Sequence, residues 1–521
     1  MVAPAYRIGV DVGGTNTDAV LMSGRQVVAS AKAFTTADVA EGVVHSVTRL
    51  LENAGLEEGR FDAVMIGTTQ FVNAFVQRSN LTPVAAIRVA LPKADGIPPM
   101  SGWPEDLIEA IRPEIYMVGG GAYYTGKDYA PLDEDAVRHA AVDARSKGFE
   151  AVAISASFSP IRPDLETRAA AIVRSVMPDA RITLSAQVGG IGLIERENAA
   201  IINACLGDMA AQVVGSLVRA FRNLRIEAPI FLSQNDGTLI STQTARRFPI
   251  MTCSAGPTNS IRGAAFLTGL DEAIVADIGG TTTDIGFLLR GFPRETTAAN
   301  DIGGVRTNFR MPDVLSIGLG GGSLVVGEPG KLRVGPRSVG YRLQSEALVF
   351  GGATLTATDI AVRADQAAIG DPGRVADLPA SLVEEALAVI HARIEAAVDQ
   401  VKTSPRPMPL VLVGGGGILV SRHLKGTSEV RRPDHADVAN AVGAAIALIS
   451  GRVDKLYDVG SLGREAALDL AKGDAIAAAV AAGALESEVE VLEVIELPMT
   501  HMKSGSVQIK VRAVGPVAAL V

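Results

Sequence analysis

Short apolar runs alternate with amphipathic stretches along most of the chain, and this alternation predicts an α/β protein. The segment YRIGVDVGGTNTDAVLMSGRQVVASAKAF predicts three strands, separated by a glycine pair and by the turn SGR. DVAEGVVHSVTRLLENAG has apolar positions at helical spacing and ends on glycine, which predicts a helix. FDAVMIGTTQFVNAFVQR predicts a strand, a Gly-Thr-Thr turn and another helix.

The pattern continues through the middle and the end of the chain. EDAVRHAAVDARSKGFEAVAISASFS predicts a helix and a strand, and PDLETRAAAIVRSVMP with RITLSAQV repeats that order. RENAAIINACLGDMAAQVVGSLVRAFRNL predicts one long helix, and APIFLSQNDGTLIS predicts two strands joined by a turn. PLVLVGGGGILVSRHLKG predicts strand, glycine turn and helix, and DHADVANAVGAAIALIS predicts a helix from Asp434. One helix and two alternating strands, EVEVLEVIEL and GSVQIKVRAV, follow Gly451.

One segment occurs twice. DVGGTNTDAVLM begins at Asp11 and DIGGTTTDIGFL begins at Asp277, and both copies follow an apolar strand and precede another. Self-similarity on this scale indicates a duplicated domain rather than a short-period repeat array. We therefore expect three units, an N-terminal domain over 1–190, a second domain over 191–451 and a small α+β module over 452–521.

Composition narrows the class of protein. The 521 residues are 48% hydrophobic and 20% charged, which is typical of a folded chain with more than one domain. The net charge of −9 argues against a nucleic-acid or anionic-membrane partner. Two cysteines and six scattered histidines do not form a disulfide framework or a zinc cluster. No signal peptide or spanning run is evident, so we expect a cytoplasmic protein.

The repeated segment has the chemistry of a phosphate loop. Paired glycines let a backbone approach a ligand closely, and successive amides then form an anion-binding concavity. An aspartate at the strand end is suited to hydrated Mg²⁺, which prefers carboxylate oxygen. The predicted ligands of phosphate and metal are Asp11, Gly13, Gly14, Thr15 and Asn16 in the first copy, and Asp277, Gly279, Gly280, Thr281 and Thr282 in the second. A single copy would equally fit an ordinary hairpin turn.

Two such loops, one on each domain, can hold one polyphosphate between them, with both aspartates on a shared metal. A third turn at Gly414, Gly415 and Gly416 follows an apolar strand and could lie under a base and ribose. A fourth at Gly320, Gly321 and Gly322 could line the phosphates or the substrate, and the sequence favours neither.

The order of these loops resembles the superfamily of actin, sugar kinases and heat-shock ATPases. Within it, the chain is most similar to the hydantoinase A/oxoprolinase family. That resemblance rests on DVGGTNTD at Asp11, GTTQFVNA at Gly67, ERENAAIINACLG at Glu195, SQNDGTLIS at Ser233, SAGPTNSIRGA at Ser254, DIGGTTTDIG at Asp277 and IGLGGGS at Ile317. It covers roughly residues 5–450.

The resemblance implies two duplicated actin-like (ribonuclease H-like) ATPase domains around a cleft, using ATP and Mg²⁺. It implies ATP-dependent ring opening of a cyclic amide or imide, such as a hydantoin, a lactam or 5-oxoproline. Phosphoryl transfer to the carbonyl oxygen would activate it, mainly through alignment and charge neutralisation. Asp11 and Asp277 are then the catalytic and metal-binding residues, and family members of this type commonly work with a second subunit.

The sequence departs from the family at PDVLSIGLGGGS, where Leu315 stands in place of a histidine, so Asp313 is expected to be a capping or turn residue. Cys253 is expected to be buried rather than nucleophilic. Residues 195–198 could face the cleft or simply begin a helix. Asn440 and Gly443 share a helix face and are expected near the third glycine turn.

Two other functions fit the same motifs. A small-molecule kinase of this superfold would release a stable phosphorylated product, and a reactivating, chaperone-like ATPase would respond to a protein partner. The ordered motifs at Gly67 and Ser254 favour the amidohydrolase. Neither the substrate ring nor the oligomeric state, which could be a homo-oligomer, follows from the sequence.

Overall fold

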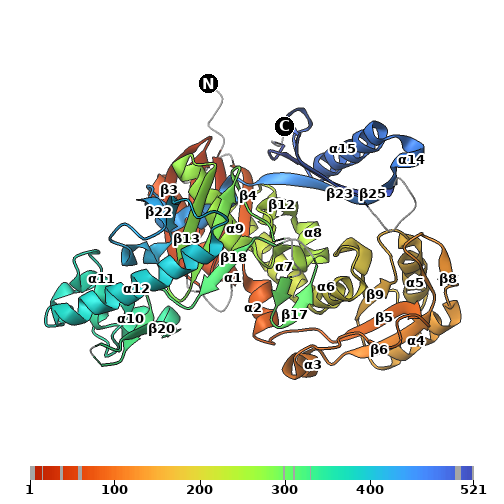
Figure 1. Cartoon of the computed structure of the whole chain (residues 1–521), viewed down its shortest axis with the longest axis horizontal. Helices are drawn as coiled ribbons and strands as arrows, with labels where there is room; N and C mark the ends of the chain where they lie inside the picture. Colours follow the sequence, from red (N-terminus) through yellow and green to blue (C-terminus); the bar gives the residue numbers. More distant parts are fainter. Residues whose placement is uncertain are drawn as a thin grey trace.

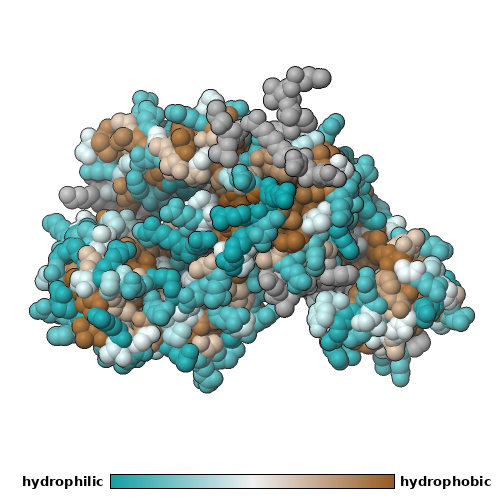
Figure 2. Space-filling view, turned by 180° about the vertical axis from the view of Figure 1, so that it is seen from behind, coloured by the Kyte–Doolittle hydropathy of each residue, from teal (hydrophilic) through white to brown (hydrophobic). Residues whose placement is uncertain are grey.

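The structure is a computed structural model of the chain, and it describes residues 6–14, 16–35, 39–56, 61–296, 300–308, 311–328, 330–498 and 506–518. Two sheet-centred lobes lie side by side, and a smaller sheet stands apart from them (Figure 1). Apolar residues on the face seen in Figure 2 are interspersed among polar ones, since most of the hydrophobic side chains are buried in the cores.

The first lobe contains a nine-stranded sheet with the order β24-β25-β23-β12-β11-β4-β1-β2-β3. Strands β1, β2 and β3 form the predicted antiparallel meander. β4 pairs parallel to β1, and β11 pairs parallel to β4. Helices α1 and α7 pack on this sheet over a buried apolar cluster. The bounds are β1 (Tyr6–Val12), β2 (Asn16–Ser23), β3 (Gln26–Phe34), α1 (Val39–Ala54), β4 (Phe61–Thr68), α7 (Gly207–Asn223), β11 (Ile230–Ser233) and β12 (Thr238–Ser241).

The second lobe repeats the centre of the first. β13 is antiparallel to β14 and parallel to β21, as β1 is to β2 and β4, so the predicted duplication is confirmed. Helices α10, α11 and α12 lie toward the outer end of this lobe (Figure 1). The bounds are β13 (Glu272–Ile278), β14 (Thr283–Leu289), β15 (Phe292–Pro293), β18 (Val314–Ile317), α10 (Leu343–Glu346), α11 (Ala357–Arg363), α12 (Ala380–Val401), β21 (Met408–Val413) and β22 (Thr427–Arg431).

A parallel four-stranded sheet, ordered β10-β9-β5-β6, is inserted into the first lobe between β4 and β11. Most residues of its strands are apolar, as expected for parallel strands covered by helices. The bounds are α2 (Gln70–Val76), β5 (Val84–Leu91), α3 (Glu105–Ile111), β6 (Glu114–Gly119), α4 (Glu134–Ser146), β9 (Ala151–Ala156), α5 (Pro163–Val176) and β10 (Arg181–Leu184). Short hairpins are β7–β8 (Gly121–Ala122, Asp128–Ala130), β16–β17 (Asn300–Ile302, Val305–Thr307) and β19–β20 (Ser323–Val326, Arg333–Ser338).

The single long helix predicted over residues 196–224 is wrong. The segment forms α6 (Leu193–Cys205) and α7, which meet at an angle of 51°. The break falls at Gly207, and glycine is a common site of helix bending because it stabilises the helix poorly. In the described part of the chain, no single helix is long and apolar enough to span a membrane. The bent pair α6–α7 together reaches that length and apolarity, but α6 is buried in a hydrophobic core of the protein.

Two helices cross between the lobes with almost no side chain between them. α9 (Ala255–Thr268) and α13 (Ala439–Ala445) pack together, each with a glycine at the crossing. A Cβ on Gly263 would lie 1.8 Å from the carbonyl oxygen of Ala439. A Cβ on Gly443 would lie 1.8 Å from that of Asn259. Only glycine therefore permits this contact of backbone with backbone.

The C-terminal strands continue the first sheet. β23 (Leu448–Asp458) pairs with β12, and β25 (Ser506–Gly515) and β24 (Glu490–Pro498) extend the sheet beyond it, covered by α15 (Arg464–Ala481). The helix predicted from Asp434 to about residue 450 is thus shorter than expected, because its last residues pair as a strand. A short α14 (Val459–Leu462) precedes α15, and α8 (Thr242–Arg247) follows β12.

The sheets divide the chain differently from the three expected ranges. β11 and β12, which lie in the expected second domain, belong to the first sheet, and so do the strands of the expected C-terminal module. The physical reason is that the chain enters the second lobe through α9 and returns through α13. We propose a first lobe that is completed by residues on both sides of the second one.

Candidate functional site

The two glycine-threonine turns have the same geometry. Asp11 lies opposite Asp18 across the β1–β2 hairpin, and Asp277 lies opposite Asp284 across β13–β14. In the first turn the Gly13 amide donates to the Asn16 carbonyl at 3.0 Å, and the Gly279 amide makes the equivalent bond to Thr282 at 2.9 Å. The repeated sequence therefore forms a repeated structure.

Helix α9 brings the two turns together. The Asn259 side-chain amide donates to Asp11 Oδ1 at 3.3 Å, and the next residue, Ser260, donates its hydroxyl to Asp277 Oδ2. Two adjacent residues of one helix thus contact the two repeated aspartates. The two aspartates are thereby brought to the same stretch of helix α9, and their sharing of one nucleotide stays a prediction.

Helix α13 contributes a second amide. Asn440 Nδ2 lies 3.0 Å from Asp11 Oδ2 and 3.0 Å from Asp18 Oδ2. The Asn440 side chain thus contacts the first hairpin, while the segment before the helix reaches the third glycine turn, where the Gly414 amide donates to the Ala436 carbonyl at 2.8 Å. Gly443 instead provides the helix crossing described above.

The site carries an excess of negative charge. Burial, followed by the nearby Asp18 carboxylate, raises the pKa of Asp11 to about 7. Burial and then Asp284 raise the pKa of Asp277 to about 6, against the lowering effect of the Ser260 hydroxyl. Burial also raises the pKa values of Asp18 and Asp284. Lys32 lies 3.1 Å from Asp18 and supplies a positive charge at this site.

This electrostatic arrangement makes the metal-free protein sensitive to pH. The folded state keeps a proton on Asp11 between about pH 4 and 7, where the unfolded chain has lost it, so the contribution of Asp11 to stability falls as the pH rises. We expect the difference between pH 5 and pH 8 to be on the order of a few kcal/mol for this group. Urea unfolding in EDTA measures it, and Asp11→Asn should flatten the profile. Parallel profiles for the two proteins would contradict the assignment.

The oxygen donors here fit a small hard cation. Asp11 and Asp277 offer carboxylates, and within the described residues the buried Oδ1 of Asn259 has no hydrogen-bond partner. Mg²⁺ prefers such oxygens and keeps several of its waters. No group of three or more His, Cys, Asp or Glu side chains in the described ranges is arranged around a metal position. The donor set therefore fits a hydrated ion better than a fully protein-coordinated one.

The tips of both turns are open to a ligand. Gly14 is exposed in the first turn, and Thr281 and Thr282 are exposed in the second. Asn16 and Gly280 are half-buried beside them, whereas Thr15 lies outside the described residues. The positions assigned to phosphate binding thus lie where a phosphate could reach them, and their role remains a prediction.

The Gly320–Gly322 turn packs behind the second phosphate loop. The amides of Gly321 and Gly322 donate to the carbonyls of Gly279 and Gly280 at 3.0 and 2.7 Å, and the amide of Gly320 donates to Ser323 Oγ. All three amides are therefore already used within the protein. This geometry favours a supporting role for the turn, and its contact with phosphate or substrate stays a prediction.

The third glycine turn also lies against the second hairpin. Gly414 has φ +80°, and a Cβ there would lie 2.3 Å from Asp277 Oδ1, while Gly416 packs on Ile278 and Gly279. Gly415 is exposed between them. A 3-10 helix, Gly415–Leu419, follows the turn instead of the predicted α-helix. The turn is therefore close to the second phosphate loop, as its proposed role with the nucleotide requires.

Other expected residues have structural roles. Arg196, Glu197 and Asn198 are buried, and Glu197 forms an ion pair with Arg88. Asp313 pairs with Arg294 at 2.6 Å, in agreement with a structural role. Burial raises the pKa of Cys253 to about 12, which disfavours a nucleophilic thiolate.

Sequence reasoning missed several residues around Asp11 and Asp277: their hydrogen-bond donors Asn259 and Ser260, their cross-strand partners Asp18 and Asp284, and Lys32, which pairs with Asp18. The second aspartate of each repeat was visible in the alignment of the two copies. The SAGPTNSIRGA motif contains Asn259 and Ser260, but only the fold shows which aspartate each one contacts.

Comparisons with known proteins agree with this fold. Residues 7–177 match the family model of the hydantoinase/oxoprolinase N-terminal region, and residues 196–367 match that of hydantoinase/oxoprolinase. The chain is 28% identical over 380 residues to the caprolactamase subunit alpha of Pseudomonas jessenii, covering 68% of this chain and 53% of that protein. It is 26% identical over 395 residues to the acetophenone carboxylase gamma subunit of Aromatoleum aromaticum, covering 68% and 52%. The chain thus spans about half the length of these relatives.

Solved structures support the same fold. A nucleotide-free acetone carboxylase structure aligns with a TM-score of 0.73 at 19% identity, covering 99% of this chain and 88% of that one. The ATP-dependent caprolactamase from Pseudomonas jessenii aligns with a TM-score of 0.73 at 20% identity, covering 99% and 89%. The paired lobes have an actin-like ATPase fold. The two family models together cover more than half of the chain. The chain belongs to the hydantoinase/oxoprolinase family.

Proposed function

We propose that this protein uses Mg-ATP to activate the carbonyl oxygen of a cyclic amide or imide, so that the ring can be opened by water. The observation that carries the proposal is the joining of Asp11 and Asp277 through Asn259 and Ser260 of one helix. Two phosphate loops facing a common region are suited to hold a triphosphate for transfer. The family and the ATP-dependent caprolactamase relative support this chemistry.

The proposed reaction balances in four steps. The γ-phosphoryl group passes from ATP to the carbonyl oxygen with ADP as the leaving group, and the ring nitrogen loses its proton. Water adds to the activated carbon, the C–N bond breaks, and an acyl phosphate and an amine form. A second water then releases phosphate and leaves the open-chain acid.

The residues of this chain would align and neutralise the reacting groups. Asp11 and Asp277 would hold Mg²⁺, which neutralises phosphate charge when bound. Asn259 and Asn440 fix the orientation of the Asp11 carboxylate, and Ser260 fixes that of Asp277. Amides and hydroxyls at Gly14, Thr281 and Thr282 would contact phosphate oxygens.

A second candidate function is suggested by other relatives. These include a gamma subunit of acetophenone carboxylase and a beta subunit of acetone carboxylase. A ketone also presents a carbonyl oxygen that can be phosphorylated, as its enol, so the same loops could serve ketone activation. Because these relatives and caprolactamase subunit alpha are named as subunits, we propose that a second subunit completes the enzyme.

A substrate panel separates these functions. We expect phosphate release by the protein and its co-purified partner to depend on a hydantoin, a lactam or 5-oxoproline, with a ring-opened product. Dependence on a ketone with bicarbonate would favour the carboxylase alternative. A stable phosphorylated product would indicate a kinase, and stimulation by a protein alone would indicate a reactivating ATPase. Either of these last two results would contradict the proposal.

A further inference from the structure

Strand β3 and the residue after it contribute two polar side chains to the first hairpin. Lys32 lies opposite Asp18, which lies opposite Asp11, so the three side chains form a row on one face of the sheet. Neighbouring strands are about 4.8 Å apart, which places the Lys32 backbone roughly 10 Å from that of Asp11. Thr35 donates its hydroxyl to the Gly13 carbonyl at 2.8 Å and so joins the end of β3 to the loop itself. This part of the chain therefore carries a cation beside the first phosphate loop.

The two copies of the hairpin differ at this position. In the second lobe, β18 has the place that β3 has in the first, and Ser316 lies opposite Asp284 and donates its hydroxyl to that carboxylate. The aspartates are thus repeated, but the residue opposite the second aspartate is a lysine in one copy and a serine in the other. A hydroxyl is therefore sufficient as a partner for this carboxylate. Lys32 adds a positive charge, and the second copy of the hairpin is formed without one at this position.

The Lys32 ammonium group links the first hairpin to the segment before α13. It lies 3.1 Å from Asp18 Oδ1 and donates to the Asp437 carbonyl at 3.0 Å. Asp437 follows Ala436, whose carbonyl accepts from the Gly414 amide of the third glycine turn. The ammonium group therefore lies where the first hairpin meets the chain that supports the third turn.

Lys32 also has the capacity to bind a ligand. An ammonium group carries three N–H donors, and its partners among the described residues are the two just named, so one donor is left for a further acceptor. The side chain is 35% exposed, which leaves this donor accessible. Burial is the largest influence on the pKa of Asp277 and raises it, whereas the Lys32 charge lowers it from the other lobe. An anion bound at the first phosphate loop would meet this cation.

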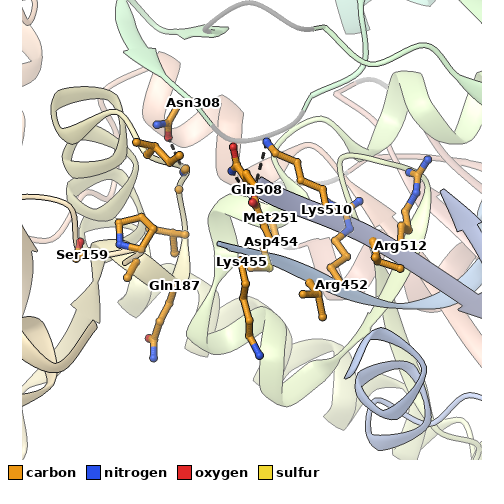
Figure 3. A pocket seen from close by; sticks show the side chains of 18 of the residues that line it. Ser159, Gln187, Met251, Asn308, Arg452, Asp454, Lys455, Gln508, Lys510 and Arg512 are labelled. Atoms are coloured by element: carbon orange, nitrogen blue, oxygen red, sulfur yellow. Dashed lines mark hydrogen bonds and ion pairs between the residues drawn. The ribbon is translucent and has the colours of Figure 1, made fainter. Parts of the chain in front are cut away.

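The basic residues of the C-terminal strands lie too far from the hairpin for this role. Arg452, Lys510 and Arg512 line a cavity of about 540 Å³ between the inserted sheet and these strands (Figure 3). They come from β23 and β25, and β23 is already four strands from β1, or roughly 20 Å at the usual strand spacing. Arg452 and Arg512 are also paired with Asp236. Strand β3, which bears Lys32, is only two strands from β1.

We propose that Lys32 is a further catalytic residue, which contacts the terminal phosphate oxygens of Mg-ATP. The inference rests on the proposed function and adds the group that neutralises phosphate charge from the side of the first lobe. Asp11 and Asp277 together would offset the two charges of Mg²⁺, so a further cation is needed to offset those of the phosphates. The ammonium group would keep its contact with Asp18 and use its remaining N–H for a phosphate oxygen.

The test replaces Lys32 with the residue type of the second copy. Lys32→Ser removes the positive charge and leaves a hydroxyl for Asp18, as Ser316 provides for Asp284. Calorimetry measures binding of Mg-ADP and of AMP, which lacks the terminal phosphates, and phosphate release from Mg-ATP is measured with the co-purified partner. We expect Lys32→Ser to weaken Mg-ADP binding about tenfold, to lower turnover about 100-fold and to change AMP binding by less than about twofold. Lys472→Ser on α15 is the control and should match the wild type.

A second variant separates this role from neutralisation of Asp18. Asp18→Asn combined with Lys32→Ser removes both charges, so that no carboxylate remains to be neutralised at this position. We expect the double variant to bind Mg-ADP as weakly as Lys32→Ser, and Asp18→Asn alone to bind it at least as tightly as the wild type. Recovery of wild-type affinity in the double variant would mean that Lys32 only neutralises Asp18. Equal weakening in Asp18→Asn alone would assign the effect to Asp18, and either result would overturn the inference.

A failure of this inference is distinguishable from a failure of the proposed function. Ring opening and phosphate release that Lys32→Ser leaves unchanged would overturn the inference and leave the proposed function intact. Selective weakening of Mg-ADP binding in Lys32→Ser, with no ring opening of any cyclic amide by the wild type, would support the inference and count against the proposed function. Equal loss of affinity for Mg-ADP and AMP would contradict a contact with the terminal phosphates.

Discussion

Replacing Asp11 with alanine is expected to lower ATP turnover by at least about 10³-fold, and Asp277→Ala should do the same. Each aspartate is positioned by α9 at the point where the two hairpins face each other. Removing either carboxylate takes away an oxygen that would hold Mg²⁺ against the phosphates. Phosphate release and binding of Mg-ADP by calorimetry measure the two effects.

Asp469→Ala is a matched control for these two variants. Asp469 is an exposed carboxylate on α15 that does not line either phosphate loop. It should retain wild-type turnover and nucleotide binding. If Asp11→Ala or Asp277→Ala kept full activity while remaining folded, the metal role of that residue would be ruled out.

Gly443→Ala is expected to be the most damaging substitution outside the phosphate loops. Its Cβ would overlap the Asn259 carbonyl oxygen, so α9 and α13 would have to move apart. Overpacking of this kind costs about 1–3 kcal/mol or more. Because these helices carry Asn259 and Asn440, the same displacement would disturb both hydrogen bonds to Asp11. Thermal unfolding and ATP turnover should both fall, and Gly263→Ala should behave in the same way.

Gly473→Ala tests whether this effect is specific to the helix crossing. Gly473 lies within α15, and no atom comes within 4 Å of a Cβ built there. Alanine at that position should be neutral or stabilise the protein by about 0.5–1 kcal/mol. If Gly443→Ala were as well tolerated as Gly473→Ala, the close packing of the two helices would not be required.

Local sequence patterns predicted the elements that depend on local interactions. The β1–β2–β3 meander and its repeat in β13 and β14 follow directly from apolar runs interrupted by a glycine pair. The duplication could be predicted because the same residues were retained at the same positions of each hairpin. The two aspartates that bear the proposed function were identified for this reason.

Features that depend on distant parts of the chain were not predictable. Asn440 lies more than 400 residues from Asp11 in sequence, so only the path of the chain through both lobes shows that they are bonded. The membership of β23 in the first sheet depends on its pairing with β12, which leaves no local signal.

The contact between α9 and α13 also limits how the molecule can move. Two helices packed backbone to backbone cannot slide past each other without steric overlap, so in any rotation of one lobe against the other we expect the crossing to be the pivot. Displacements are smallest near a fulcrum and grow with distance from it. Asp11 and Asp277, which are bonded to residues beside the crossing, would keep their separation, while the outer helices α10, α11 and α12 would travel furthest.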